Sequence, residues 1–461
     1  MSNLFAVRKT LKNYANGGNV LIFATVLALL VVNLPFLHNF YNSLWTHEIA
    51  LQVGGFNLFS HHGHPMSIMA FINDALMAIF FFSIGLEIKR EVLVGELSSF
   101  RQALLPIVAA IGGMGFPVLI FFILGHGTDY IGGAAIPMAT DIAFSLGILS
   151  MLGSRVPISL KIFLTTLAVV DDIGGILVIA IFYSTEINFW MLLAAAVLLV
   201  ILAFGGKFGI QSKLFYFGIG AFVWFLFLNA GIHPTIAGVL IAFTVPARPI
   251  YAPKKYIKTI RENIRYFAHE DDEALNSKTI LNHDQMNWLK EIESASDKVI
   301  SPLQDMEDSL HPVVNYLIVP LFAFANAGIY FGDLEFSSIF HGVSLAIIVG
   351  LLAGKFLGVF IFSWLTVKLG WAPMPEGCNW KQIASVALLA GIGFTVSLFI
   401  ANLSFDTGDP ILSPLLDNAK LGILVGSLLA GFGGWLALHY TLPQPKTETP
   451  VSFHKEIKQK I

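Results

Sequence analysis

The sequence predicts an all-α protein that crosses a membrane many times, and three observations lead to this fold class. Hydrophobic residues make up 56% of the 461-residue chain, whereas charged residues make up only 12%, about half the share typical of soluble domains. The apolar residues form runs of the length that a membrane-spanning helix needs, roughly 17–25 residues. Basic residues fall almost entirely in alternate connections between these runs. Lipid must therefore surround most of the chain.

The apolar runs predict about twelve membrane helices. Their expected positions are 19–36, 67–88, 103–125, 132–152, 158–183, 189–206, 214–230, 232–247, 312–330, 343–367, 381–402 and 418–439. All Lys and Arg residues except Lys355 and Lys420 lie in the tails, in the connections that follow even-numbered helices, or at a helix start in those connections. Cytoplasmic segments carry such an excess of positive charge, so both termini are expected in the cytoplasm.

The whole chain, residues 1–461, is expected to form one membrane domain, in which three segments lie outside the membrane. Residues 38–66 contain Val53-Gly54-Gly55-Phe56 between short apolar runs, which predicts a small external β-hairpin. Residues 248–310 carry clustered charges and predict short amphipathic helices in a cytoplasmic polar insertion. Residues 441–461 form a cytoplasmic tail. The first apolar run has no clear cleavage site after it and is expected to remain as a helix.

Four ionisable residues fall inside predicted spans: Asp141, Asp171, Asp172 and Lys355. A charge near the bilayer centre costs at least roughly 2.5–3.5 kcal/mol, so such residues indicate function. Asp171 and Asp172 point about 100° apart on a helix and cannot do the same work. One can face a water-filled cavity while the other pairs with a neighbouring helix, where Lys355 is the expected partner. A structural salt bridge is the alternative, but three acids and one base favour a cluster that takes up cations or protons.

Two of the charged spans also contain poor helix formers at their centres. Pro137 precedes Thr140-Asp141, and Gly391 and Gly393 interrupt the eleventh predicted span. Either interruption alone is compatible with a tolerated kink. Together they predict two broken helices that cross at mid-membrane and expose half-helix ends. Asp141 would then offset the positive N-terminal ends and Lys355 the negative C-terminal ends.

With these residues in place, the chain resembles the NhaA family of sodium/proton antiporters over most of its length. The matching segments are 85–91 (GLEIKRE), 139–144 (ATDIAF), 152–157 (LGSRVP), 170–172 (VDD), 322–328 (FAFANAG), 354–355 (GK), 391–395 (GIGFT) and 419–422 (AKLG). Each segment alone is weak, but eight in order are specific. The resemblance implies inverted repeats, formed by predicted helices 3–5 and 10–12, with the broken helices at the ion site.

The resemblance also implies roles for individual residues. Asp172 would be the principal ligand of Na⁺ or Li⁺, Asp171 its companion that also pairs with Lys355, and Thr140-Asp141 the polar part of the crossing. Adjacent aspartates in this family imply electrogenic exchange.

The same resemblance implies a pH-responsive region, a location and a partner. Glu87, Glu91, Glu307 and His311 would respond to pH, although charged residues at a helix end are often only solvated. Asp308 departs from the family pattern, and so does the length of the 248–310 insertion. A bacterial inner membrane, a homodimer that forms through the external hairpin, and no cofactor are further expectations.

Other function classes receive less support from the sequence. The main alternative is a cation-coupled symporter for an organic solute, but mainly Gly, Ala and Val adjoin the charged residues. Asp406-Thr407-Gly408 matches an aspartic-protease triplet, yet it has no second copy and falls in an expected external loop. The glycine-rich stretches lack a phosphate-binding Gly-Lys-Ser/Thr. A net charge of −3 gives no indication of nucleic-acid binding, and the single cysteine, Cys378, excludes an internal disulfide.

Overall fold

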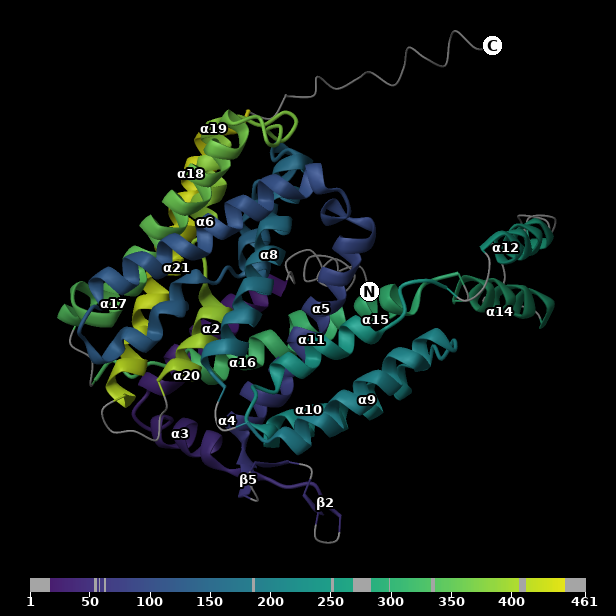
Figure 1. The fold of residues 1–461 in the computed structure, drawn as a ribbon, viewed down its shortest axis with the longest axis horizontal. Helices are drawn as coiled ribbons and strands as arrows, with labels where there is room; N and C mark the ends of the chain where they lie inside the picture. The colour runs from purple at the N-terminus through teal and green to yellow at the C-terminus, as the bar shows by residue number, and fades with distance from the viewer. Residues whose placement is uncertain are drawn as a thin grey trace, which may run out of the picture.

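The protein forms a bundle of tilted helices with a small β-structure at one end (Figure 1). The computed structural model describes residues 17–53, 56–57, 59–61, 64–184, 187–249, 253–267, 283–297, 299–332, 336–405 and 412–443. The tail beyond residue 443, Asp406-Thr407-Gly408 and the central glycines of the predicted hairpin lie outside the described residues.

Within the described residues, eight helical runs are long and apolar enough to cross a membrane, which confirms a multi-pass helical protein. Three of these runs each join three helical elements, because short π-helical turns interrupt the α-helix without ending it. The runs are α4–η1–α5 (Ile68–Val94), α6 (Phe100–Leu124), α8 (Ile158–Phe182), α9 (Phe189–Lys207), α10 (Lys213–Ala230), α15–η5–α16 (Pro302–Asn326), α17–η7–α18 (Gly342–Lys368) and α21 (Ser413–Thr441).

Three further pairs of helices would each be one span if their two halves were joined. The pair α2 (Gly17–Asn33) and α3 (His38–Thr46) bends by 112°. The pairs η3 (Asp129–Met138) with α7 (Ile142–Met151), and α19 (Trp380–Leu389) with α20 (Phe394–Ser404), each bend by 44°. The remaining apolar helix, α11 (Thr235–Thr244), is short. Every predicted span overlaps one of these helices, but the number of crossings stays a prediction because α11 is short and α3 turns sharply away from α2.

The predicted hairpin region contains more structure than a single hairpin. Residues 38–46 form α3, because their apolar residues recur at helical spacing and bury Tyr41 and Trp45. In the described part of residues 48–67, five short strands form two small antiparallel sheets, with orders β1-β5-β4 and β2-β3. These strands are β1 (Glu48–Ile49), β2 (Gln52–Val53), β3 (Phe56–Asn57), β4 (Ser60–His61) and β5 (His64–Ser67). Val53 pairs with Phe56, as expected for a turn at the two glycines.

Among its described residues, the polar insertion contains the helices α12 (Pro253–Phe267) and α14 (His283–Asp297). Helix α15 begins at Pro302, near the end of the insertion, and its helical run continues to residue 326, so the ninth span starts earlier than its hydropathy suggests. Ser301 is the N-cap of α15, since its hydroxyl accepts a hydrogen bond from the backbone amide of Gln304.

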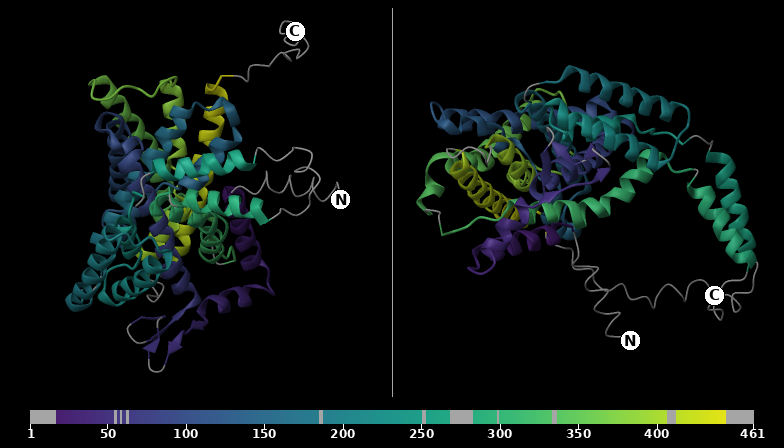
Figure 2. Two further views of the ribbon diagram at one scale, coloured as in Figure 1. Left: turned by 90° about the vertical axis from the view of Figure 1, so that its right-hand side faces the viewer. Right: turned by 90° about the horizontal axis from the view of Figure 1, so that it is seen from below.

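Small residues allow the central helices to pack closely. A Cβ at Gly358 of α18 would meet the Gly112 carbonyl oxygen of α6, and one at Gly238 of α11 would meet the Ala78 carbonyl oxygen of α5. Membrane helices associate through such close backbone contacts, because lipid supplies no hydrophobic drive between them. The outer face of α9 instead exposes large apolar side chains, including Phe189 and Trp190. Figure 2 shows the strands at one end of this bundle.

Candidate ion site

The two broken helical pairs meet at their breaks. The amide of Asp141 donates a hydrogen bond to the Ile392 carbonyl oxygen at 2.6 Å. On either side of this contact, the Ser145 hydroxyl donates to the Leu389 carbonyl oxygen at 3.2 Å, and the Ser397 hydroxyl donates to the Ile136 carbonyl oxygen at 2.7 Å. Backbone groups that lose their helical hydrogen bonds at each break therefore find hydrogen-bond partners in the other pair, as burial in a membrane requires.

The residues predicted to interrupt the helices lie at this crossing. Pro137 is the next-to-last residue of η3, and Gly391 and Gly393 lie between α19 and α20. A Cβ at Gly391 would meet the Leu351 carbonyl oxygen, and a Cβ at Gly393 would come within 3.1 Å of the Ala139 carbonyl oxygen. Glycine at position 391 thus lets η7 (Gly350–Gly354) approach the break closely, and glycine at position 393 eases the approach of Ala139 from the other pair.

Asp141 lies where two helices begin. It is the N-cap of α7, and its carboxylate accepts a hydrogen bond from the Phe144 amide at 3.0 Å. Its other oxygen accepts from the Thr395 amide at 3.1 Å and the Thr395 hydroxyl at 2.6 Å, at the start of α20. One carboxylate thus faces the positive ends of two helix dipoles.

Lys355 and Asp171 form an ion pair whose side chains are both fully buried. The ammonium lies 2.5 Å from Asp171 Oδ2 and 2.9 Å from Thr140 Oγ1. The Thr140 oxygen is also within 2.7 Å of Asp171 Oδ2 and 2.8 Å of the Ala390 carbonyl oxygen. A hydroxyl has one proton, so Thr140 can donate to only one of these acceptors at a time. Thr140 therefore connects the ion pair of α8 and α18 to the end of α19.

The two carboxylate oxygens of Asp171 differ in their hydrogen bonding. Asp171 Oδ1 is buried and has no hydrogen-bond partner within the described part of the chain. A buried acceptor without a partner carries a desolvation cost of about 1–3 kcal/mol, more for a charged group. This oxygen is therefore available to a cation or a proton.

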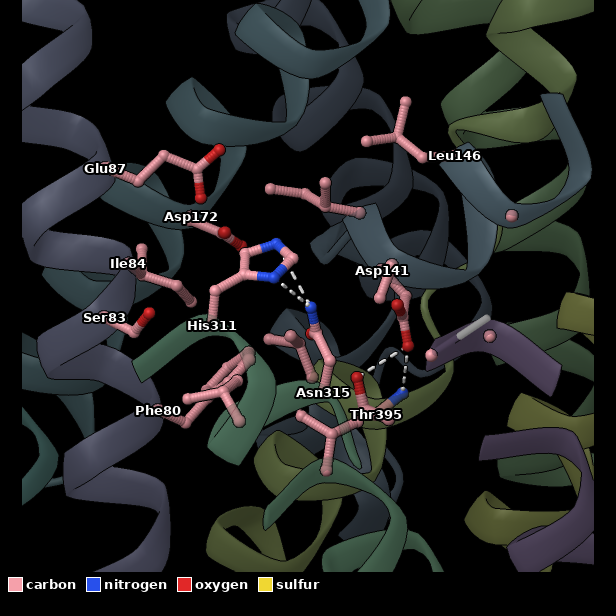
Figure 3. A pocket seen from close by; sticks show the side chains of 18 of the residues that line it. Phe80, Ser83, Ile84, Glu87, Asp141, Leu146, Asp172, His311, Asn315 and Thr395 are labelled. Atoms are coloured by element: carbon pink, nitrogen blue, oxygen red, sulfur yellow. Dashed lines mark hydrogen bonds between the residues drawn. The ribbon is translucent and has the colours of Figure 1, made fainter. Parts of the chain in front are cut away.

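Asp172 has a different environment from its neighbour. It lines a cavity of about 230 Å³ that also touches Thr140, Asp141 and Thr395, whereas Asp171 does not line this cavity. Figure 3 shows Asp172 on one side of the cavity and Asp141, bonded to Thr395, on the other. The two adjacent carboxylates thus have separate environments, one held against Lys355 and one at the cavity wall.

The four residues expected to respond to pH fall into two groups. Glu87 and His311 line the same cavity as Asp172, and a ring nitrogen of His311 lies 3.0 Å from the Asn315 amide nitrogen (Figure 3). Glu91 and Glu307 instead share Arg90, each at 3.0 Å. This arginine connects α5 to α15.

Thr395 and Asn315 were not singled out from the sequence. Thr395 follows the glycine interruption directly, so a polar residue beside that break was the available signal for a partner of Asp141. Asn315 gives no comparable signal, because its approach to the cavity depends on where the π-helical turn η5 (Val314–Ile318) rotates it.

Comparisons with known proteins cover nearly the whole chain. The family model described as Na⁺/H⁺ antiporter 1 matches residues 8–438. A Na⁺/H⁺ antiporter NhaA of Phocaeicola vulgatus is 54% identical over 450 residues, which are 96% of this chain and 98% of that protein. Proteins with the same description from Bacteroides fragilis and Bacteroides thetaiotaomicron are 54% and 51% identical over 95% of this chain and 99% of their own lengths. The matched segment includes every residue of the crossing, the ion pair and the cavity.

Proposed function

The chain belongs to the Na⁺/H⁺ antiporter 1 family, and from this premise we propose that it expels Na⁺ or Li⁺ in exchange for protons at Asp171 and Asp172. It is a multi-pass membrane protein and a secondary transporter, not an enzyme. Membership of this family favours Na⁺/H⁺ exchange over the alternative function, a cation-coupled symporter for an organic solute. The ions are the transported substrates, and the transporter needs no cofactor.

One observation carries the assignment of the site: Asp172 faces the cavity while Asp171 beside it is held by Lys355. Na⁺ enters through the cavity and binds the Asp172 carboxylate, with Asp171 Oδ1 and Thr140 as further oxygen ligands. Binding of the cation displaces protons from the carboxylates, because both compete for the same oxygen atoms. On the other side of the membrane, protons displace Na⁺.

The charge of the cluster couples the two ions. Asp141, Asp171 and Asp172, when ionised, outweigh Lys355 by two negative charges. A site with this charge is costly to move through the centre of a bilayer unless a cation or protons accompany it. Reorientation of the loaded or protonated site therefore gives exchange, and the empty site does not permit a leak.

The crossing of the broken helices supports further architectural proposals. The two pairs bend by the same angle, 44°, and each supplies hydrogen-bond partners for backbone groups of the other. This equivalence supports two inverted repeats. One repeat consists of α6, η3–α7 and α8, and the other consists of α17–α18, α19–α20 and α21. Twelve crossings would place both termini on the same side of the membrane, and the excess of basic residues in the tails assigns that side to the cytoplasm of a bacterial cell, with the protein in its inner membrane.

Two proposals concern regulation and assembly. The Arg90 contacts with Glu91 and Glu307, and the position of Glu87 and His311 at the cavity, support pH control of ion entry from the cytoplasm. The strands of residues 48–67 project from the bundle, which supports a homodimer contact through this external β-structure.

The first test is ion exchange by the protein in liposomes that contain a pH dye. Addition of Na⁺ or Li⁺ is expected to collapse an imposed pH gradient, whereas K⁺ and choline are not. Asp172→Asn is expected to abolish the response, because it removes the charge that faces the cavity. Asp284→Asn, a change of the same kind at an exposed residue of α14, should retain it. Normal exchange by folded Asp172→Asn would overturn the assignment.

A further inference from the structure

Helices α12 and α14 form a pair that stands apart from the membrane bundle. Figure 1 and the right-hand view of Figure 2 both show them beyond the ends of the other helices. Their main packing partners are each other. One face of α12 therefore packs against α14. This leaves the question of what the rest of its surface contacts.

The face of α12 that meets α14 is polar and aromatic. The Asn263 amide donates a hydrogen bond to a Glu291 oxygen at 2.9 Å, and Asn263 is 5% exposed. Tyr266 stacks on Trp288 with ring centroids 5.9 Å apart. The pair is thus not held together by the aliphatic residues of α12.

Those aliphatic residues form a separate stripe. Ile257, Ile260 and Ile264 recur at spacings of three and four and so share one face of the helix. Ile257 is 47% exposed and Ile264 is 53% exposed, although both are among the most apolar residues of the segment. An amphipathic helix normally buries such a stripe.

Positive charge flanks the stripe on the side away from α14. At about 100° per residue, Lys258, Arg261 and Arg265 lie next to the isoleucines, and all three are exposed. Glu262, the one acidic residue in the sequence of α12, pairs with Lys258 at 3.6 Å. Arg261 and Arg265 have no ion pair with any described residue. An aliphatic face with a basic flank is typical of helices that lie in the plane of an anionic membrane surface.

The connections of the pair hold it near the membrane. Helix α11 ends at Thr244, nine residues before the first residue of α12, which limits their separation to about 30 Å. On the other side, α14 ends at Asp297 and the apolar run from Pro302 begins soon after. Tethered at both ends to helices of the bundle, α12 meets lipid at a high effective concentration.

We propose that α12 docks on the anionic lipid surface beside the helical bundle. Ile257, Ile260 and Ile264 enter the boundary between headgroups and acyl chains, and Lys258, Arg261 and Arg265 contact lipid phosphates. Helix α14 lies on the water side and orients α12 through Asn263. This docking fixes the position of the first residues of α15 along the bilayer normal. Helix α15 carries Glu307. The inference does not depend on the ion-exchange mechanism.

The test uses the full chain in lipid nanodiscs with one fluorescent probe. Cys378→Ser removes the only native thiol, and Ile264→Cys supplies a site for an environment-sensitive dye. In phosphatidylcholine mixed with phosphatidylglycerol, we expect a blue-shifted emission that brominated acyl chains quench and aqueous iodide does not. Pure phosphatidylcholine and high salt should both weaken this protection. The same dye at Glu262→Cys, on the polar side, should be quenched by iodide throughout.

A charge variant separates lipid docking from other causes of burial. Each basic residue near an anionic surface shifts the docking equilibrium about fivefold, so Lys258→Gln/Arg261→Gln/Arg265→Gln should lower the docked-to-undocked ratio about a hundredfold. An unchanged unfolding temperature in detergent shows that the variant is folded. Iodide quenching at position 264 in every lipid would overturn the proposal. Equal protection in detergent and in both lipids would overturn it as well, because it would assign the stripe to a protein partner.

Discussion

At the scale of single residues, the ion pair of Asp171 and Lys355 has a structural consequence apart from transport. Both side chains are fully buried, and Asp171 has only Lys355 and Thr140 as polar partners among the described residues. Replacement of one member of a buried pair leaves the other charge uncompensated, at a cost of about 3–5 kcal/mol. We therefore expect Lys355→Met to lower the free energy of unfolding by about this amount, measured by thermal unfolding in detergent.

Two controls make this expectation specific. Lys381→Met, at an exposed position, should unfold at the temperature of the unmodified protein. The double variant Asp171→Asn/Lys355→Met should recover much of the lost stability, because it removes both charges. If Lys355→Met unfolds together with Lys381→Met, the pair does not stabilise the fold.

The sequence could indicate which charged residues matter, but not how each one is used. The cost of charge in a bilayer singles out Asp141, Asp171, Asp172 and Lys355 without any structure. Their separate environments depend on the rotation of α8 about its axis, and apolar residues on all sides of that helix leave the rotation undetermined. The contact of Asp141 with Thr395 depends on the register between two helical pairs that are about 250 residues apart in the chain.

At the scale of secondary structure, the break between α19 and α20 depends on the close approach of neighbouring helices at Gly391. A Cβ at Gly391 would meet the Leu351 carbonyl oxygen and lie 3.2 Å from the Ala430 Cβ. Overpacking of a buried site costs about 1–3 kcal/mol, so Gly391→Ala should lower the unfolding temperature and slow Na⁺-driven proton exchange. Gly433→Ala is the matched control, since a Cβ there would meet nothing within 4 Å.

Gly433→Ala is expected to be neutral or slightly stabilising, because alanine favours a helix over glycine by about 1 kcal/mol. Equal effects of the two substitutions would show that helix propensity, and not the close approach at the crossing, determines the outcome. Exchange by Gly391→Ala at the normal rate would contradict the role given to the break.

The elements themselves were predicted unevenly, and for physical reasons. Long apolar runs such as α6, α8 and α21 were located within a few residues, because lipid imposes a length and a composition on them. Helix α3 lies where the sequence predicts only a hairpin, and the apolar pattern does not predict that α15 continues into the ninth span, since both segments are amphipathic and adjoin apolar runs. The breaks at Pro137 and Gly391 were found because backbone chemistry, and not hydropathy, marks them.

At the scale of the whole molecule, the charge balance of the cluster determines whether transport moves net charge. In the proposed exchange, binding of one Na⁺ displaces protons from the two adjacent carboxylates, Asp171 and Asp172. If both protons leave, each cycle carries two protons against one Na⁺, and one net charge crosses the membrane. Each such charge couples the exchange to the membrane potential by about 2.3 kcal/mol per 100 mV.

Liposomes loaded with Na⁺ and diluted into Na⁺-free buffer test this stoichiometry. As Na⁺ leaves and protons enter, the interior should become positive, and this potential should oppose further exchange. With K⁺ on both sides, valinomycin lets K⁺ flow out, and we expect it to speed proton entry severalfold. A potential-sensitive dye should report the interior-positive potential only without valinomycin. If valinomycin has no effect and no potential develops, exchange is one for one, and only one of the two carboxylates releases a proton to the transport cycle.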